Sequence, residues 1–396
     1  MQFSVKTIFR SIMVITILLL HDRFLLASAR SHESGSDELI REVASLLSEV
    51  LQEDAIQRLI EIDQDLSADT AVKKVSEIQQ QILSALATSQ DELGLAHVRS
   101  VFENAPERRA SAASALASAT TIRPTDLQDW RFLVRSLPVV QGDDAVAVMN
   151  ALQRFRTRAN KGQWVRQVIL VGLELPVDKQ SAATSLLRHW TGVPLRKADA
   201  PAWTLQKYQD WFLKEYPNQP EPVLPVDPEG RQWTMASLEA PIRDFIATDA
   251  VTGQGALVYQ KAGCQKCHRR GKVGEALGPD LTSLGWRRQR REILRATLYP
   301  SHELDEEYPT VTVVLKNGKT LTGMMSASSA DTLAIVSNTG LREELPRAEV
   351  ENIVNQKTSN MPDGLLEPLT KDEIISLVAW LSSVEGIERP HTDEGP

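Results

Sequence analysis

The chain has 396 residues, of which 42% are hydrophobic and 24% are charged. This is the composition of an ordinary globular protein with room for two or three domains, and it excludes a disordered or collagen-like chain. The net charge of -8, from 44 basic and 52 acidic residues, argues against a nucleic-acid-binding protein, which needs a basic surplus or a concentrated basic face.

Residues 1–29 have the pattern of an export signal. Lys6 and Arg10 precede an apolar run at 12–20, and the small residues at 27–29 follow as a cleavage site. A membrane anchor is the alternative, but it needs about 20 apolar residues, and this run has about half that number. We therefore predict cleavage after residue 29 and an exported protein, periplasmic or extracytoplasmic, with no stable membrane span.

Helical spacing of apolar residues dominates residues 36–216. Pro138, Pro176 and the pair Gly192 and Pro194 break the pattern where a helix cannot continue. We interpret the region as an α-helical domain of stacked hairpins, and its helix lengths and short loops favour a HEAT-like, repeat-like solenoid. The apolar positions are Leu39, Val43, Leu46, Leu47, Val50 and Leu51; Val72, Val75, Ile78, Ile82 and Leu86; Val148, Leu152 and Phe155; Val165, Val168, Ile169 and Leu173; and Ala182, Leu186, Leu187 and Trp190.

A proline-rich stretch separates this region from a second domain. Five prolines fall within residues 217–228, a composition that favours an extended, semi-rigid spacer. We place a linker and lead-in at 217–246 and expect helices over 249–262 and around 289–298. The predicted second domain, residues 247–388, follows this linker.

Inside the second domain the pattern changes from helical spacing to alternation. Asn317-Gly318 joins two β-branched or alternating runs and is the strongest short-range hairpin signal in a sequence. A capping box that begins at Thr370 then opens a last helix. A β insertion at 307–354 is therefore expected within a helical domain, and residues 389–396 form a tail. The predicted strands are 310–315, 319–325, 332–336, 341–345 and 350–354.

The motif that carries chemistry is Cys264-Gln265-Lys266-Cys267-His268. Its two cysteines are the only ones in the chain, so no disulfide framework stabilises the fold. Thiols at this spacing lie on one helical turn, where each can add to a vinyl group of the same porphyrin, and the adjacent imidazole can ligate the iron. The sequence therefore predicts one covalently attached haem c with its iron.

Two other functions of a Cys-x-x-Cys pair are less well supported. A zinc site needs four ligands, and the remaining His97, His189 and His302 are scattered along the chain. A redox dithiol of the thioredoxin kind stands at a strand-to-helix junction of a βαβ unit, and no such unit is predicted around Cys264. The adjacent His268 and the export signal favour haem over both.

Two further features resemble class I cytochromes c. The segment 278–281, ten residues after His268, resembles the loop in which a proline carbonyl, here that of Pro279, accepts the proton of the proximal imidazole. Gly255 on the first helix of the domain and Trp380 on the last resemble the crossing helices of that fold, where a glycine lets an aromatic side chain approach closely.

The sixth ligand of the iron is predicted from its place in a loop. Met361 lies in a polar loop between the β insertion and the last helix, where it has little core to fill. Without the insertion, its separation from His268 is that of an axial methionine, so we favour Met361 as the axial thioether. Met324, Met325 and His302 are alternatives, and one of the two methionines should point into the sheet core. We expect His268 and Met361 on opposite walls of one cavity.

From Gly255 to Leu381 the order of elements resembles the haem-binding domain family at the C-terminus of many large planctomycete and verrucomicrobial secreted proteins. The resemblance covers about a third of the chain. It implies a monohaem cytochrome c domain with Cys264 and Cys267 as thioether residues and His268 and Met361 as metal ligands. The matching pieces are Cys264 to His268, Gly278 to Leu281, Tyr299-Pro300-Ser301, Tyr308, Asn317-Gly318-Lys319, Leu321-Thr322-Gly323, Leu345-Pro346 and Met361 to Leu365.

The predicted fold class is mainly α, a helical-hairpin N-terminal domain plus a class I-like cytochrome c domain with a small β-sheet insertion. The predicted function is that of an exported monohaem c-type cytochrome, a one-electron carrier between a periplasmic dehydrogenase and an acceptor. With both axial positions filled, we expect no enzymatic activity. An acidic surface at the haem edge, if one is present, would select a basic partner. The alternatives are a haem enzyme or a gas or peroxide sensor with an open distal site, and a helical interaction scaffold that bears a haem module.

Overall fold

The computed structural model describes residues 34–48, 52–68, 75–89, 91–122, 126–194, 202–227, 229–245, 249–305, 307–326 and 329–389. The predicted export signal and all but the first residue of the predicted tail lie outside these ranges. The described chain is mainly helical with one small antiparallel sheet, as the sequence predicts. Within this part of the chain, no helix is both long and apolar enough to cross a membrane.

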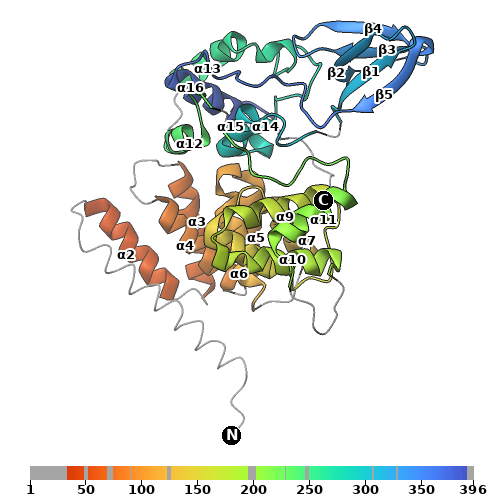
Figure 1. Cartoon of the computed structure of the whole chain (residues 1–396). Helices are drawn as coiled ribbons and strands as arrows, with labels where there is room; N and C mark the ends of the chain where they lie inside the picture. Colours follow the sequence, from red (N-terminus) through yellow and green to blue (C-terminus); the bar gives the residue numbers. More distant parts are fainter. Residues whose placement is uncertain are drawn as a thin grey trace. The chain divides into compact units, whose positions relative to one another are not determined.

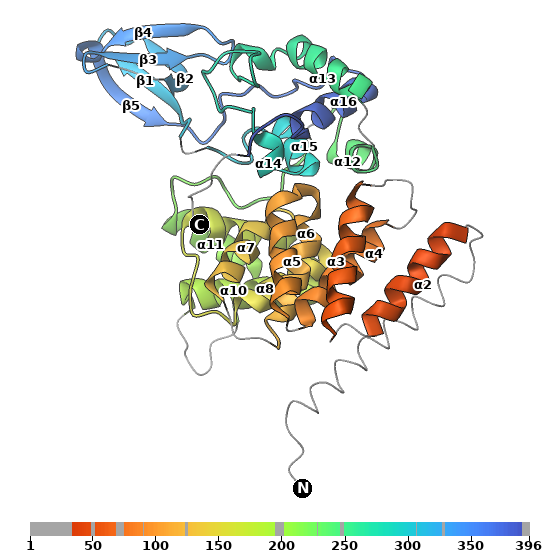
Figure 2. The ribbon, with the colours of Figure 1, turned by 180° about the vertical axis from the view of Figure 1, so that it is seen from behind.

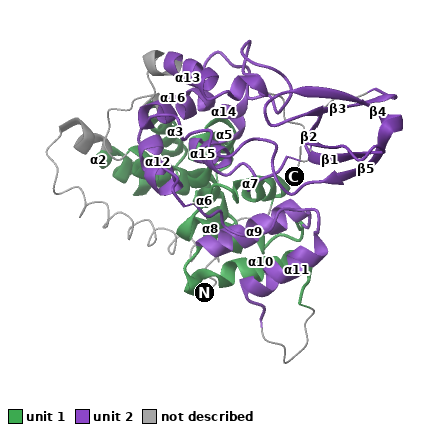
Figure 3. Cartoon of the chain, turned by 45° about the horizontal axis from the view of Figure 1, so that its top comes forward, with its two compact units in different colours: residues 1–159, 175–195, 396 green, residues 160–174, 196–395 purple. Residues whose placement is uncertain are grey.

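The chain forms two compact units (Figure 3). The first contains the described residues up to 159 together with 175–194, and the second contains 160–174 and the described residues from 202 onward. The predicted boundary at 217–228 therefore falls inside the second unit. Residues 160–174 and 202–216 of the predicted helical domain therefore belong to the same unit as the two cysteines.

Helices of the first unit pack in two layers. Helices α4, α6, α8 and α10 contact one another in succession, and α3, α5 and α7 do the same beside them (Figures 1 and 2). The unit contains α2 (Ser34–Ser48), α3 (Glu53–Ala68), α4 (Val75–Thr88), α5 (Glu92–Asn104), η1 (Pro106–Arg108), α6 (Arg109–Ala119), α7 (Leu127–Ser136), α8 (Gly142–Leu152), η2 (Val177–Lys179) and α10 (Ser181–Thr191).

Local chemistry explains where these helices begin and end. The Asp91 and Asp126 carboxylates accept backbone N–H groups at the starts of α5 and α7, which stabilises both N-termini. Helix α10 ends at Gly192, whose φ of 73° is the left-handed conformation that glycine adopts without strain. Helix α6 is mostly alanine and serine and lacks a stripe of large apolar residues, so its small buried side chains were not visible as a pattern.

A buried carboxylate ties two of these helices together. Asp63 on α3 is 1% exposed, accepts hydrogen bonds from Arg108 at 2.6 and 3.1 Å, and lies 2.8 Å from Nε2 of His97 on α5. Burial opposes ionisation of Asp63, but the hydrogen bonds of His97 and Arg108 outweigh it and hold the pKa of this carboxyl below its ordinary value. The ion pair therefore carries a charge at neutral pH.

The helical part of the second unit is built around one close crossing. A Cβ on Gly255 of α13 would lie 2.3 Å from Cβ of Trp380 and 2.4 Å from the carbonyl oxygen of Ser376, both on α16. The predicted close approach of Gly255 and Trp380 is thus confirmed. The helices of this unit are α9 (Gly162–Glu174), α11 (Leu205–Glu215), α12 (Met235–Arg243), α13 (Asp249–Lys261), η3 (Cys264–Lys266), α14 (Leu284–Arg287), α15 (Arg290–Leu298) and α16 (Lys371–Ser382).

The insertion forms a five-stranded antiparallel sheet in the order β4-β3-β2-β1-β5, which extends from the helices of the second unit (Figures 1 and 2). Gly318, with a φ of 83°, turns the predicted β1–β2 hairpin. The sheet core contains Val311 and Val313 of β1 with Leu333 and Ile335 of β3. The elements are β1 (Thr310–Leu315), β2 (Thr320–Ser326), β3 (Thr332–Val336), β4 (Arg342–Pro346), η4 (Arg347–Glu349) and β5 (Val350–Asn355).

Candidate functional site

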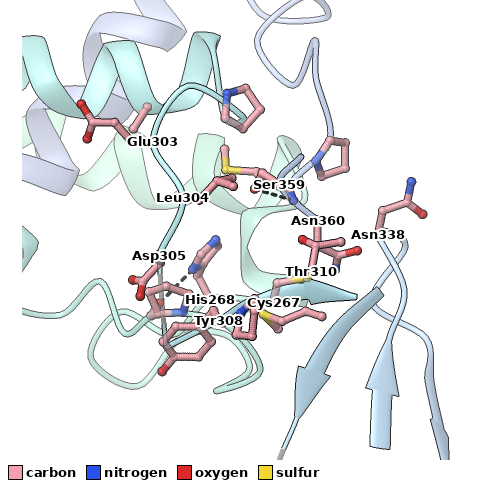
Figure 4. Close-up of a pocket in the computed structure, with 18 of the residues that line it drawn as sticks. Cys267, His268, Glu303, Leu304, Asp305, Tyr308, Thr310, Asn338, Ser359 and Asn360 are labelled. Carbon is pink, nitrogen blue, oxygen red and sulfur yellow. Dashed lines mark hydrogen bonds between the residues drawn. The ribbon is translucent and has the colours of Figure 1, made fainter. Parts of the chain in front are cut away.

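The second unit contains a cavity of about 640 Å³, a volume typical of sites for cofactors and small molecules (Figure 4). Its walls come from the cysteine motif, the loop after it, the segment after α15, one end of the sheet and the loop before α16. All five residues predicted for the site, Cys264, Cys267, His268, Pro279 and Met361, line this one cavity. The structure therefore brings together residues from two loops almost a hundred positions apart.

The cysteine motif forms one tight turn directly after α13. Gly263 ends the helix with a φ of 78° and redirects the chain into η3. The carbonyl oxygen of Cys264 then accepts the backbone N–H groups of Cys267 at 3.2 Å and His268 at 3.0 Å. Both cysteines are free thiols. Since one turn presents both thiols to the same cavity, they can react with two groups of a single bound molecule.

The environment of the thiols does not favour thiolate chemistry. Burial raises the pKa of Cys264 to about 11 and also raises the pKa of Cys267. A redox dithiol works through a thiolate with a lowered pKa, so the site lacks that activation. In the described ranges, no group of three or more His, Cys, Asp or Glu side chains is arranged to hold a metal ion.

The imidazole of His268 is fixed in one tautomer. Its Nδ1 lies 2.8 Å from the carbonyl oxygen of Pro279 (Figure 4), and because a carbonyl only accepts hydrogen bonds, Nδ1 carries the proton. The other nitrogen, Nε2, then has a lone pair available for a ligand. Burial lowers the pKa of His268, which keeps the ring neutral. The predicted role of Pro279 has a geometric basis here, since it orients the ring that would ligate a metal.

The loop that holds His268 is tied to the motif by contacts the sequence did not reveal. The hydroxyl of Tyr259 donates to the carbonyl oxygen of His268 at 2.5 Å. Gly274 has a φ of 95°, and a Cβ there would lie 2.1 Å from the same carbonyl oxygen. Gly278 packs against the His268 ring, where a Cβ would lie 3.2 Å from Cε1. The repeated glycines after the motif were the available signal of this tight packing.

The loop of Met361 is held by the sheet and by the segment after α15. Its backbone N–H donates to Oγ of Ser359 at 3.1 Å (Figure 4), and the N–H of Ser359 donates to Oγ of Ser301 at 3.1 Å. Nδ2 of Asn360 donates to the carbonyl oxygen of Val336 at the end of β3, at 3.0 Å. The insertion thus positions the thioether that the sequence predicts as an axial ligand.

The alternative axial ligands occupy different environments. Met324 of β2 lines the cavity beside Thr310, its partner in the β1–β2 register, while Met325 is 37% exposed. Met324 is buried at 5% exposure, as expected for one of the two methionines, but it lies outside the apolar cluster of the sheet core. The reason is that the end of β2 forms a cavity wall. His302 does not line the cavity, and burial, with Arg166 and Arg295 nearby, lowers its pKa to about 4.

Several polar residues of the cavity wall escaped prediction. Asn338 follows β3, and Asn218 and Gln219 come from the segment predicted as a spacer. No local motif marks them, because only tertiary packing brings them to the cavity.

Comparison with known proteins adds no assignment to this chain. No protein-family model matches it, and no curated protein matches it in sequence.

The donor set of the cavity fits haem c. Two thiols on one turn suit attachment to two vinyl groups, a neutral imidazole with a free Nε2 suits iron, and the thioethers of Met361 and Met324 reach the same space. The cavity is also large enough for a cofactor of this class.

Proposed function

We propose that this protein is an exported monohaem c-type cytochrome that carries single electrons between redox proteins. The observation that carries the proposal is that Cys264, Cys267, His268 and Met361 line one cavity while Pro279 holds the His268 ring with Nε2 available. Haem c, when bound, supplies an iron that alternates between the ferric and ferrous states. Cys264 and Cys267 would hold the porphyrin through thioether bonds.

The residues of this chain would then fix the coordination of the iron. His268 would ligate through Nε2, and Pro279 keeps that ring in one orientation by accepting its Nδ1–H. Met361 would supply the thioether, which raises the reduction potential of a haem. If His268 and Met361 both bound the iron, no position would remain on it for a substrate, which favours an electron carrier over an enzyme or a sensor.

The finer fold assignment belongs to the same proposal. The crossing of α13 and α16 at Gly255 and Trp380 and the turn of Cys264 directly after α13 support a class I-like cytochrome c domain that carries a β insertion. The alternation of helices in two layers supports a HEAT-like stack in the first unit.

The segment around the cysteine motif is rich in basic residues, whereas the net charge of the whole chain suggested an acidic surface. Residues 261–291 contain nine basic and two acidic residues, although the whole chain has a net charge of -8. Lys261, Lys266, Arg269 and Lys272 are exposed. An acidic redox partner is therefore proposed in place of a basic one, because opposite charges steer the encounter of two proteins.

The optical spectrum of the haem-loaded protein tests the proposal. Exported wild-type protein should carry covalently bound haem and, when oxidised, show the weak near-infrared band of methionine-to-iron ligation. The Met361→Ala variant should lose this band, whereas the matched Met324→Ala variant, which alters another thioether of the same cavity, should keep it. A wild-type spectrum that is high-spin and readily binds carbon monoxide would instead favour a haem enzyme or sensor. Absence of covalent haem would overturn both.

A further inference from the structure

One wall of the cavity comes from a segment that precedes the cytochrome-like domain. Asn218, Gln219 and Pro220 line the cavity together with residues of the cysteine motif. They follow α11 directly and lie within the proline-rich stretch. A stretch whose composition suggests a spacer therefore contributes side chains to the candidate site.

A buried arginine fixes the backbone of this wall. Arg166 of α9 is 6% exposed. Its Nε donates to the carbonyl oxygens of Pro220 at 3.0 Å and Glu221 at 3.1 Å, and its Nη2 donates to that of Glu221 at 3.0 Å. Burial lowers the pKa of Arg166 to about 10, so the guanidinium stays charged at neutral pH. Hydrogen bonds from a charged donor are stronger than those from a neutral donor, so Arg166 holds the carbonyl groups of Pro220 and Glu221 in place.

Two further hydrogen bonds hold the segment after α11 against α11 and against the residues just before α9. The hydroxyl of Tyr216 donates to the carbonyl oxygen of Asn160 at 2.9 Å, and Nε2 of Gln209 donates to that of Pro222 at 2.8 Å. At Gly162, the first residue of α9, a Cβ would lie 2.9 Å from the Tyr216 ring and 3.0 Å from Cγ of Gln219. The helix start therefore lies directly behind the cavity wall.

The same arginine is electrostatically coupled to Glu303 and to Arg295 of α15. Glu303 lines the cavity, and its carboxylate favours the charged form of Arg166, while Arg295 opposes it. Arg295 in turn donates to Glu303 at 2.8 Å. The guanidinium of Arg166 thus lies within reach of the charges that follow α15, where the cytochrome-like domain builds its own part of the wall.

We propose that α9, α11 and residues 217–222 are an integral part of the haem site, with Asn218 and Gln219 as haem-contacting residues and Arg166 as the positioning residue that holds them. This inference rests on the proposed function, since it takes haem c as the ligand. The two amides offer N–H donors to the polar groups of a porphyrin, its carboxylates above all. By closing one side of the cavity they also exclude water, which favours the less charged ferrous state and raises the reduction potential.

The inference predicts that haem orders this segment. Hydrogen exchange of the backbone amides of Asn218, Gln219 and Glu221, the residues of 217–222 that are not proline, should be slower in the haem-loaded protein than in the Cys264→Ser, Cys267→Ser double variant, which cannot attach haem covalently. Equal exchange in the two proteins would overturn the assignment of Asn218 and Gln219 as haem contacts. This readout does not depend on any activity of the loaded protein.

The role of Arg166 is tested by Arg166→Met, which keeps the length of the side chain but removes its donors. In the haem-loaded variant, exchange within 217–222 should be about tenfold faster, as expected for the loss of hydrogen bonds to a charged group. Its reduction potential should fall below that of the wild type. The matched control is Arg154→Met in the first unit, where Arg154 donates to the carbonyl oxygen of Thr120 at 3.3 Å, and it should change neither property.

A second variant covers the case in which Arg166→Met does not fold. Gln219→Leu keeps the shape of the side chain, removes its amide, and should lower the reduction potential without unfolding α9. Unchanged potentials in the variants that fold, measured on protein that carries covalent haem, would overturn the inference and leave the electron-carrier proposal standing. Wild-type protein without covalent haem would overturn both, so the two failures are distinguishable.

Discussion

Trp380 lies so close to Gly255 that no side chain fits between them, because a Cβ on residue 255 would be 2.3 Å from Cβ of Trp380. The carbonyl oxygen of Ser376 stands 2.4 Å from the same point. Both obstacles belong to the rigid body of α16 and are not the tip of a flexible side chain. The crossing of α13 and α16 therefore depends on a glycine at this position.

Substitution of Gly255 tests this dependence. Gly255→Ala should force the two helices apart and lower the free energy of unfolding by about 1–3 kcal/mol, the usual cost of overpacking. The matched control is Gly253→Ala on the same helix, where nothing lies within 4 Å of the added Cβ. The control should be neutral or slightly stabilising, because alanine has the higher helix propensity. Urea unfolding of both variants measures the difference, and equal stability would contradict the close crossing.

The buried pair of the first unit predicts a dependence of stability on pH. Because the pKa of Asp63 is lowered in the folded state, its charge stabilises the fold above the unfolded-state value of about 3.9. This contribution disappears as the pH falls through the lower folded-state value. Asp63→Asn should therefore cost about 1–3 kcal/mol at neutral pH and less in acid.

The exposed pair of Asp143 with Lys179 supplies the control for this experiment. The side chain of Asp143 is 85% exposed, so Asp143→Asn should change the free energy of unfolding by less than about 1 kcal/mol at any pH. Urea unfolding between pH 2 and 7 gives both profiles. A constant difference between wild type and Asp63→Asn across this range would contradict the lowered pKa of Asp63.

The Met361 loop predicts a further effect on coordination. Asn360 anchors the loop to β3 through its bond to the Val336 carbonyl oxygen, so Asn360→Ala should weaken methionine ligation without removing any ligand. We expect a reduced near-infrared band and faster binding of cyanide by the oxidised protein. Asn352→Ala, at an exposed position on β5, is the control and should behave as the wild type. A full band in Asn360→Ala would show that the loop holds its place without the sheet.

The basic surface predicts how electron transfer responds to salt. Reduction by the hexacyanoferrate(II) anion should slow as ionic strength rises, because salt screens its attraction to Lys266 and Lys272. The Lys266→Gln, Lys272→Gln double variant should react more slowly at low salt and show a weaker salt dependence. Lys214→Gln on α11, also exposed, is the control. Stopped-flow absorbance measures all three proteins, and identical salt profiles would rule out this surface as the route of approach.

Elements set by local signals could be predicted, and those set by packing could not. The hairpin at Asn317-Gly318 and the helix after the Thr370 capping box are specified by contiguous residues, and both are present. Helix α12 lies within the stretch predicted as a linker and lead-in from the prolines at 217–228, although the capping box of Thr234 and Ser237 opens this helix.

The same division applies to the candidate site. The contact between His268 and Pro279 could be predicted because the segment 278–281, close to the cysteine motif in the chain, resembles a loop of c-type cytochromes. The rest of the cavity lining includes Asn218 and Met324, which are far apart in the chain and belong to no shared motif. Their place depends on how α11 and the sheet pack, and apolar spacing carries no information on that.

The bond between Asn360 and Val336 has a consequence for any attempt to make a minimal version of this protein. A chain shortened by joining the end of α15 to the loop before α16 would lose Met324 and Thr310 from the cavity and the support beneath Met361. The sheet is an insertion between two helices, and from its place in the chain alone it would look dispensable. The contacts instead make the sheet a scaffold for the Met361 loop, so engineering must trim the β1–β2 turn or the outer edge strands and leave the inner end of the sheet intact.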